Sequence, residues 1–337
     1  MGTLSDAMAV LSEALRSRKA RLLVVDSDPG SHTDLLLRNW DSPPFHPTRD
    51  ISRLSDDLRS FRPDIALIFK TEGVDPVTTA PLFQQSGLTW VHAAGTGIDH
   101  IADWAGTGIV VSNAAGVLSP NNAEYAMTAI LAANINFPLY QRQQGAEIWR
   151  GHPRRGLSQQ TLVILGVGEI GLRVARLAKA FGMHVIGVSR TRKNDPALDE
   201  SLTNDQLISA IGRADFLVVC VPLTADTRGL IDDAMLRRMK SSSVLVNLAR
   251  GHIVDEIALA DALENGRLRA AVLDVFDAEP LPAGHPLWRV RNLSITPHIS
   301  GLIEDWRERH VKEFLSNAQR VREGGMPRSV VDADARY

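Results

Sequence analysis

The chain has 337 residues, which is more than one ordinary domain needs and suits two. Its 37 Lys and Arg residues nearly balance 39 Asp and Glu residues, so the formal net charge is only -2. That total does not point to nucleic acid, although a local basic cluster would not be visible in it. A hydrophobic share of 44% excludes global disorder, and a single cysteine, Cys220, excludes an intramolecular disulfide.

No targeting or membrane segment stands out. The first twenty residues lack the continuous apolar core of a signal peptide. The most apolar stretch, residues 123–140, is interrupted by Asn134, Asn136 and Pro138. We therefore expect a cytoplasmic protein with no membrane and no nucleic-acid partner.

Short apolar runs alternate with helical patterns along most of the chain. This alternation is typical of parallel sheets covered by helices. The pattern therefore predicts an α/β protein with two doubly wound parallel-sheet domains. Its expected strands are residues 21–25, 64–69, 89–93 and 109–112 in the first half, and 161–165, 184–188, 216–221, 243–247, 270–274 and 293–296 in the second.

A long helix is expected between the two halves. Ser119 as a cap and Pro120 at the first helical position predict a connector helix over about residues 120–144. A final helix near residues 303–323 is expected to return to the first domain. These expectations make the first domain discontinuous, with residues 1–114 and 299–337, and assign residues 115–298 to a nucleotide-binding domain.

A glycine-rich turn directly follows the expected strand 161–165. In Gly166-Val-Gly168-Glu-Ile-Gly171 the first glycine permits a tight turn, the second lets a pyrophosphate approach, and the third allows close helix packing. The helix that begins here offers free amides and partial positive charge to phosphates. On its own this spacing also fits a structural turn, but its strand–turn–helix setting favours a dinucleotide site that includes Glu169 and Ile170.

The end of the next strand carries cations where an acidic residue would usually bind the ribose 2′-hydroxyl. The segment reads Ser189-Arg190-Thr191-Arg-Lys193. A guanidinium at Arg190 suits a phosphate monoester, and Ser189 and Thr191 can add neutral donors. The alternative is a solvated basic loop. The position favours NADP(H) over NAD(H).

Four further segments resemble motifs of one enzyme family. Ala94-Gly-Thr-Gly-Ile-Asp99, Asn247-Leu-Ala-Arg250-Gly, Asp274-Val-Phe-Asp-Ala-Glu279-Pro and Thr296-Pro-His298 resemble, in this order, motifs of the D-isomer-specific 2-hydroxyacid dehydrogenases. The Ser-Arg-Thr segment is similar to that of the glyoxylate and hydroxypyruvate reductase branch. The resemblance covers nearly the whole chain from about residue 65. It implies a Rossmann cofactor domain inserted in a flavodoxin-like substrate domain.

The resemblance also implies three catalytic residues. Arg250 would bind the carboxylate and carbonyl oxygen of a 2-oxoacid, and His298 would deliver a proton to the developing alkoxide. Glu279 would stabilise the protonated imidazole and fix its tautomer. The alternatives are a surface arginine, a structural histidine and an ordinary loop carboxylate.

Further site residues are carried over from the same family. Backbone amides of Thr96 and Gly97 would hold the substrate carboxylate, together with Arg250 and His298; the alternative is a plain glycine turn. Asp274 matches the nicotinamide side but is equally expected as a cap. The remaining cofactor-binding positions implied by the resemblance are Val221, Pro222, Thr227, Leu248, Ala249, Arg250, Asp274 and His298.

The sequence offers no metal-ligand spacing, so we expect no metal. Two tryptophans depart from or extend the family pattern. Trp149 matches a region where some relatives contribute a tryptophan across a dimer interface. Many relatives follow the catalytic histidine with a small, hydroxyl-bearing turn, whereas here residues 299–305 lead to Trp306, which is expected to narrow or reshape the substrate pocket.

Together these features predict NADPH-dependent reduction of a 2-oxoacid of the glyoxylate or hydroxypyruvate type to the (2R)-hydroxy acid. The site is expected in the cleft between the domains, and the resemblance implies a homodimer. Two alternatives remain at this point: a cofactor-sensing corepressor-like protein, and a dehydrogenase of the same fold that acts on phosphite or formate.

Overall fold

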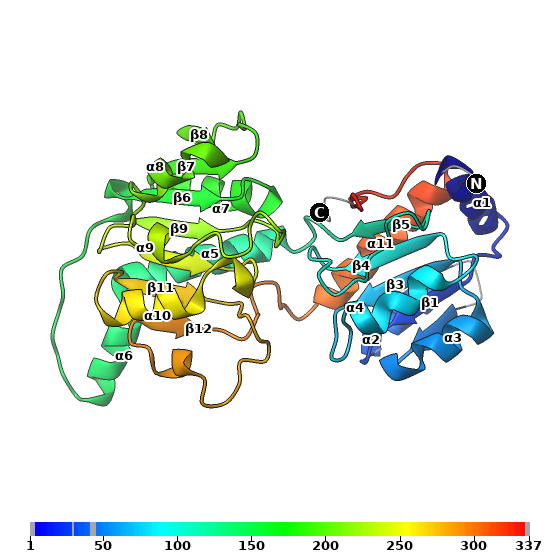
Figure 1. Ribbon diagram of the computed structural model, residues 1–337, viewed down its shortest axis with the longest axis horizontal. Coiled ribbons are helices and arrows are strands. Elements are labelled where there is room, and N and C mark those ends of the chain that lie inside the picture. The colour runs from blue at the N-terminus through cyan, green and yellow to red at the C-terminus, as the bar shows by residue number, and fades with distance from the viewer. Residues whose placement is uncertain (1–3, 29, 41–44, 334–337) are drawn as a thin grey trace. The chain divides into compact units, whose positions relative to one another are not determined.

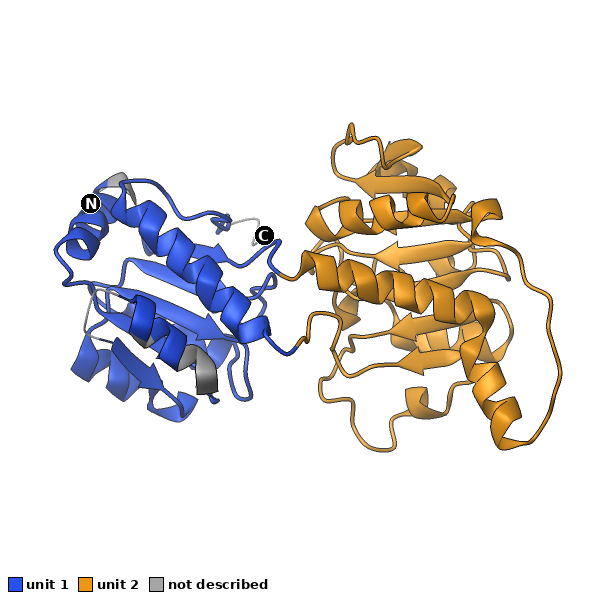
Figure 2. Cartoon of the chain, turned by 180° about the vertical axis from the view of Figure 1, so that it is seen from behind, with its two compact units in different colours: residues 1–117, 304–337 blue, residues 118–303 orange. Residues whose placement is uncertain are grey.

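The computed structural model describes residues 4–28, 30–40 and 45–333. The chain divides into two compact units (Figure 2). Unit 1 comprises Met1–Val117 and Glu304–Tyr337, and unit 2 comprises Leu118–Ile303. The sequence analysis expects these divisions after residues 114 and 298, a few residues earlier than in the structure.

Unit 1 contains a five-stranded parallel sheet (Figure 1). Its strand order is β2 (Phe45–Thr48), β1 (Leu22–Val25), β3 (Ile65–Phe69), β4 (Trp90–Ala94) and β5 (Val110–Asn113). This 2-1-3-4-5 order is the flavodoxin-like one. Residues of α1 (Leu4–Arg16), α2 (Gly30–Asn39) and α11 (Trp306–Arg322) pack on one face of this sheet. Residues of α3 (Leu54–Phe61) belong to the core on the opposite face. The short helix α4 (Pro76–Thr79) follows β3 in the chain.

Unit 2 contains a seven-stranded parallel sheet. Its order is β12 (Leu293–Ile295), β11 (Ala270–Leu273), β10 (Val244–Asn247), β9 (Phe216–Val219), β6 (Thr161–Leu165), β7 (His184–Ser189) and β8 (Glu200–Thr203). The first strand of the unit, β6, pairs with both β7 and β9, so the chain winds outward on either side of it, as in a Rossmann fold.

Helices cover both faces of the unit 2 sheet. One core combines α5 (Ser119–Ile135) and α7 (Glu169–Ala180) with the sheet. The opposite core contains residues of α8 (Leu207–Ile211), α9 (Asp233–Leu236) and α10 (Glu256–Glu264). The two units therefore confirm the predicted fold class of two parallel-sheet α/β domains.

All ten strands expected from the sequence are present, within about two residues at each end. Two strands were not expected, β2 and β8, and both lie at an edge of a sheet. Their side chains are mostly half-exposed. An edge strand does not need a continuous apolar run, so neither segment carries the signal of a buried strand.

The connector differs from the expected single helix. It is broken into α5 and α6 (Phe137–Gly145), because Asn136 adopts a left-handed conformation with φ 58° and Pro138 follows it. Ser119 is the first helical residue rather than the cap. Its hydroxyl instead accepts a hydrogen bond from Arg173 Nε at 3.0 Å.

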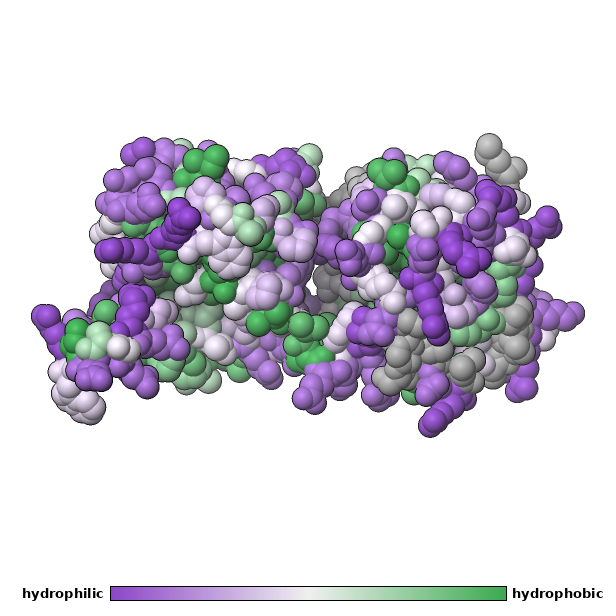
Figure 3. Space-filling view, turned by 90° about the horizontal axis from the view of Figure 1, so that it is seen from below, coloured by the Kyte–Doolittle hydropathy of each residue, from purple (hydrophilic) through white to green (hydrophobic). Residues whose placement is uncertain are grey.

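The face drawn in Figure 3 is mainly polar. On the face drawn in Figure 3, apolar residues form small separate groups among hydrophilic ones. Within the described ranges, no helix combines the length and apolar character needed to span a bilayer. The large apolar side chains are concentrated in the cores on either side of the two sheets.

Candidate active site

The candidate residues of unit 2 lie at one edge of its sheet. The parallel strands β6, β7, β9, β10, β11 and β12 all end at this carboxyl edge, and a predicted segment follows each of them. In doubly wound sheets ligands bind at this edge, near the strands where the winding direction reverses. Here that position is between β6 and β9.

At two positions of the glycine-rich turn, neighbouring backbone atoms leave no room for a side chain. A Cβ on Gly166, which has φ +100°, would lie 2.7 Å from the Cys220 carbonyl carbon, and one on Gly171 would lie 2.1 Å from the Gly166 oxygen. A Cβ on Gly168 would meet nothing within 4 Å. Gly166 therefore brings this turn against the start of the segment after β9, whereas Gly168 leaves space for a ligand.

The amino end of α7 has unused donors. The N-cap residue is Gly168, so no side chain of the N-cap accepts a hydrogen bond from the first amides of the helix. In the part of the chain that the structure describes, the backbone N–H groups of Gly168, Glu169 and Ile170 have no acceptor. Free amides at the start of a twelve-residue helix suit a pyrophosphate. The geometry of this turn is compatible with a dinucleotide.

The end of β7 carries the predicted cation loop. Arg190 and Thr191 are exposed, and Ser189 is half-buried. The Ser189 hydroxyl donates to the Thr191 carbonyl at 2.8 Å. This bond fixes the turn and uses the Ser189 hydroxyl proton.

The segment after β9 is a fixed turn. The Thr227 hydroxyl donates to the Pro222 carbonyl at 2.6 Å and accepts from the Thr224 amide at 2.8 Å. Val221 begins this turn, and its nitrogen would lie 2.8 Å from a Cβ on Gly166. The structure thus brings Val221 to the glycine-rich turn and assigns the Thr227 side chain a role within the loop.

The turn that carries Arg250 packs against the loop that carries Glu279. Asn247 holds the turn, because its amide donates to the Arg250 carbonyl at 2.9 Å and its oxygen accepts from the Ala249 amide at 3.1 Å. Leu248 and Ala249 are buried, and Arg250 Nη1 donates to the Ala249 carbonyl at 2.7 Å. A Cβ on Gly251 would lie 2.0 Å from the Phe276 carbonyl carbon, so only glycine fits there.

His298 and Glu279 form the predicted pair. His298 Nδ1 lies 2.7 Å from Glu279 Oε2, and Glu279 Oε1 accepts the Phe276 amide at 3.0 Å. With Nδ1 bound to the carboxylate, Nε2 is the ring nitrogen left for a substrate. Buried Glu256 supports the same loop by accepting the Asp277 amide at 2.8 Å, and burial raises the pKa of Glu256.

Asp274 organises the segment around His298. Its carboxylate accepts the Thr296 hydroxyl at 2.7 Å and the amides of Ile299 and Ser300, each at 2.8 Å. Its carbonyl accepts the His298 amide at 2.8 Å. The structure therefore gives Asp274 the capping role that the sequence left open beside the nicotinamide role.

Two polar residues in this region were missed by the sequence analysis, Glu256 and Tyr125. Glu256 follows a good helix cap, Asp255, and reads as an ordinary first-turn carboxylate. Tyr125 is a lone phenol in an apolar helix. Neither carries a motif that would have identified it.

Unit 1 holds the predicted substrate loop. It follows β4, and Asn113 fixes it by donating to the Thr96 carbonyl at 2.7 Å. Among the described residues, the amides of Thr96 and Gly97 have no acceptor. Asp99 pairs with Lys70, with 3.0 Å between Nζ and Oδ2. The loop therefore presents two backbone donors, as a nest for an anion requires.

The two tryptophans differ in their surroundings. The Trp149 side chain is fully exposed in the single chain, next to half-exposed Ile148. Trp306 packs edge-on against Phe69, with 6.0 Å between ring centroids, and Arg307 lies over its ring at 4.5 Å. Trp306 is thus partly buried and packs against the core of unit 1.

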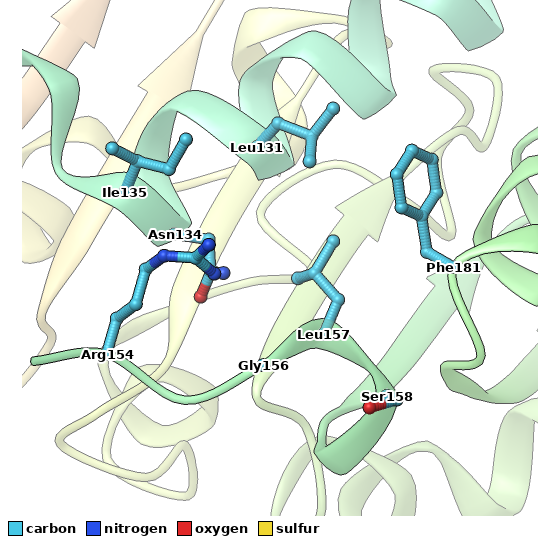
Figure 4. Close-up of a pocket in the computed structure, with 8 residues that line it drawn as sticks. All are labelled: Leu131, Asn134, Ile135, Arg154, Gly156, Leu157, Ser158 and Phe181. Atoms are coloured by element: carbon cyan, nitrogen blue, oxygen red, sulfur yellow. The ribbon is translucent and has the colours of Figure 1, made fainter.

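A hollow of about 340 Å³ lies elsewhere in unit 2, between α5 and the segment before β6 (Figure 4). None of the predicted catalytic or cofactor-binding residues lines it. The lining residues are Leu131, Asn134, Ile135, Arg154, Gly156, Leu157, Ser158 and Phe181. Within the described ranges no group of three or more His, Cys, Asp or Glu residues could hold a metal ion.

Comparison with known proteins identifies the family. Residues 127–300 match the model of the D-isomer specific 2-hydroxyacid dehydrogenase NAD binding domain. A glyoxylate reductase of Aeropyrum pernix is 36% identical over 266 residues, which cover 75% of this chain and 79% of that protein. A D-3-phosphoglycerate dehydrogenase of Methanocaldococcus jannaschii is 35% identical over 271 residues, covering 76% of this chain and 50% of that one.

Solved structures agree with this assignment. An NADPH-dependent glyoxylate/hydroxypyruvate reductase from Sinorhizobium meliloti, in complex with NADP and sulfate, has a TM-score of 0.83 at 26% identity, covering 95% of this chain and 100% of its own. A family member from Aeromonas salmonicida has a TM-score of 0.80 at 30% identity, covering 94% and 100%. The chain is therefore an oxidoreductase that belongs to the D-isomer-specific 2-hydroxyacid dehydrogenase family.

Proposed function

We propose that the protein reduces a small 2-oxoacid of the glyoxylate or hydroxypyruvate type to the (2R)-hydroxy acid, with NADPH as the reductant. The observation that carries this proposal is the 2.7 Å pair of His298 and Glu279, set beside the Arg250 turn at the carboxyl edge of the sheet. The glyoxylate reductase relatives support the substrate class.

Each residue has a distinct task. The reduced nicotinamide ring, when bound, supplies the hydride. The Arg250 guanidinium binds the substrate carboxylate and polarises the carbonyl oxygen. His298 gives the proton on Nε2 to the oxygen that becomes the hydroxyl, and Glu279 stabilises the charged ring before that transfer. Amides of Thr96 and Gly97 are proposed as further donors to the carboxylate.

The proposed preference for NADPH depends on the loop at the end of β7. Arg190 supplies a planar guanidinium there, and residues 189–194 include no Asp or Glu that could bind a free ribose hydroxyl. Arg190→Ala is expected to weaken NADPH binding by about tenfold to a hundredfold, on the scale of a charge-assisted hydrogen bond. NADH binding should change by less than about threefold.

A homodimer is also proposed. Ile148 and Trp149 expose large apolar surfaces after α6, and exposed aromatic side chains of this kind commonly anchor protein interfaces. Light scattering of the purified protein should give twice the chain mass. Trp149→Ser should shift the protein toward the monomer, and a wild-type monomer at all concentrations would exclude the dimer.

The central test is a substrate screen with both reduced cofactors. Oxidation of NADPH is followed with glyoxylate, hydroxypyruvate, pyruvate, phosphohydroxypyruvate and a ketone without a carboxylate. We expect turnover with the first two acids and none with the simple ketone, because Arg250 has no anion to bind. Absence of turnover with every 2-oxoacid would refute the proposed function, and oxidation of phosphite or formate with NADP would favour the rival reaction.

A further inference from the structure

Tyr125 connects helix α5 to the segment that carries His298. Its hydroxyl oxygen lies 2.5 Å from Thr296 Oγ1, although the two residues are 171 positions apart. The buried residues of the same helix are mainly apolar and include Ala123, Ala126 and Ile130. A phenol directed at one threonine is therefore a specific polar contact in an apolar setting.

The direction of this hydrogen bond follows from the next one. Thr296 Oγ1 lies 2.7 Å from Asp274 Oδ1, and an ionised carboxylate can only accept. Thr296 has a single hydroxyl proton, which is used on Asp274. Tyr125 must then donate to Thr296. The result is a directed chain from phenol to hydroxyl to carboxylate, in which each bond polarises the next.

The chain ends on the group that shapes the catalytic segment. The Asp274 carboxylate also binds the amides of Ile299 and Ser300, and its carbonyl binds the amide of His298. His298 has φ +53°, a conformation that costs energy in a residue with a side chain. Surrounding contacts must hold such a residue in place, and the Asp274 contacts do so.

Burial keeps Tyr125 in the form that the chain requires. Burial and the charge of Asp274 raise the pKa of Tyr125 to about 12, against a smaller lowering by the hydrogen bond with Thr296. The phenol is therefore protonated near neutral pH and available as a donor. A second contact lies close by, since a Cβ on Gly301 would be 3.3 Å from Leu118 at the start of α5.

We propose that Tyr125 is a positioning residue for the reaction: through Thr296 and Asp274 its hydroxyl fixes the segment that presents His298 to the substrate. This inference rests on the proposed function, because it assigns Tyr125 to the proton-transfer step. Tyr125 does not itself touch the reacting atoms.

The first test compares Tyr125→Phe with Tyr140→Phe. Both changes remove one phenolic hydroxyl, but among the described residues that of Tyr140 bonds the His152 backbone, far from His298 in the sequence. Tyr125→Phe should lower kcat by about fivefold to tenfold, the scale of one hydrogen bond. KM for the 2-oxoacid and the Kd for NADPH should stay within about twofold, because Arg250 and the glycine-rich turn are unchanged. The solvent deuterium isotope effect on kcat should rise, since a misaligned donor makes proton transfer slower.

The second test asks whether Tyr125 acts through His298. In a His298→Gln background there is no imidazole to align, so adding Tyr125→Phe should cause no further loss of kcat. An equal loss in both backgrounds would overturn the inference. So would a Tyr125→Phe enzyme with wild-type kcat and an unchanged isotope effect.

The third test does not need activity. Amide exchange measured by mass spectrometry should be faster in residues 296–303 of Tyr125→Phe than of wild type or Tyr140→Phe. Unchanged exchange would contradict the positioning role. If the wild-type enzyme turns over no 2-oxoacid, the proposed function fails, and the exchange result alone then decides whether Tyr125 holds this segment.

Discussion

The two units place histidines in opposite environments. In unit 2, His298 is half-exposed at the carboxyl edge of the sheet, with Glu279 at 2.7 Å. In unit 1, His92 on β4 and His310 on α11 are buried beside Phe314, and His92 Nδ1 bonds only the Ser112 hydroxyl, at 2.8 Å. Burial thus opposes the charged ring in unit 1, whereas in unit 2 the imidazole lies beside a carboxylate and solvent.

The surroundings of each histidine, rather than its residue type, decide whether it can transfer a proton. Burial, and secondarily the charge of His310, lowers the pKa of His92 to about 3, and burial lowers the pKa of His310 to about 4. Rings held neutral in this way are core residues and cannot deliver protons near neutral pH. The ring of His298 has the partner that a proton donor needs.

The largest expected effect is on His298. His298→Gln should lower kcat by about a thousandfold, because the general acid is lost, while NADPH binding is retained. His184→Gln is the matched control. His184 also pairs with a glutamate, Glu200, with 2.9 Å between Nε2 and Oε1, but it lies at the amino end of β7. Steady-state kinetics and cofactor titration would check this, and comparable turnover in both variants would remove the proton-donor assignment.

The next effect is the acid sensitivity of unit 1. His92 and His310 have folded pKa values below the ordinary 6.5, so the unfolded chain binds more protons than the folded one below pH 6.5. Their contribution to stability is fully present above pH 6.5 and is lost as the pH falls toward 4. Each buried histidine should remove about 1.4 kcal/mol per pH unit in that window.

Substitution of His92 tests this directly. His92→Leu should reduce the pH dependence of unit 1 stability, because one buried ring with a lowered pKa is removed. Ser112 keeps a partner, since the Trp90 indole also donates to its hydroxyl at 2.8 Å. Amide exchange between pH about 7 and 5 resolves unit 1 from unit 2. Equal acid sensitivity in His92→Leu and wild type would contradict the role given to this ring.

A smaller effect is expected from Glu279→Gln. The amide oxygen can still accept the Phe276 amide, but the carboxylate partner of the imidazole is gone. We expect kcat for reduction to fall by about tenfold to a hundredfold. Steady-state kinetics measure this, with Glu200→Gln as the control at the His184–Glu200 pair. Wild-type kcat in Glu279→Gln would show that Glu279 does not act on His298.

The smallest effect concerns Cys220 and shows that burial decides in unit 2 as well. Burial raises the pKa of the Cys220 thiol to about 12, so almost no thiolate is present near neutral pH. Iodoacetamide at pH about 8 should leave activity within about twofold of the untreated enzyme. Urea should then expose this single cysteine to labelling. Rapid inactivation of the folded enzyme would be the contrary result.

The fold was predictable where strands are buried on both faces. The run from Phe216 to Val219 is apolar throughout because it lies inside the sheet, so its sequence alone identifies it. β8 reads Glu-Ser-Leu-Thr, with every side chain half-exposed at the sheet edge. Pairing with β7 makes it a strand, and no local pattern records that pairing.

The candidate site was predictable where its residues lie in contiguous sequence motifs. The glycine-rich turn and the segments around Arg250, Glu279 and His298 each carry local signals. Tyr125 and Glu256 act through contacts with distant segments, at Thr296 and Asp277 respectively. Only the tertiary structure brings such partners together, so these supporting residues could not be inferred from spacing.

The location of the β7–β8 loop has a consequence for how this enzyme can change. Arg190 and Thr191 are exposed. They follow β7, which is separated from the edge of the sheet only by β8. Substitutions at such positions usually alter folding stability by less than about 0.5 kcal/mol. If the proposed role of this loop is right, coenzyme choice can change through evolution or engineering almost independently of folding. Gly251 has no such freedom, because a Cβ there would lie 2.0 Å from the Phe276 carbonyl carbon.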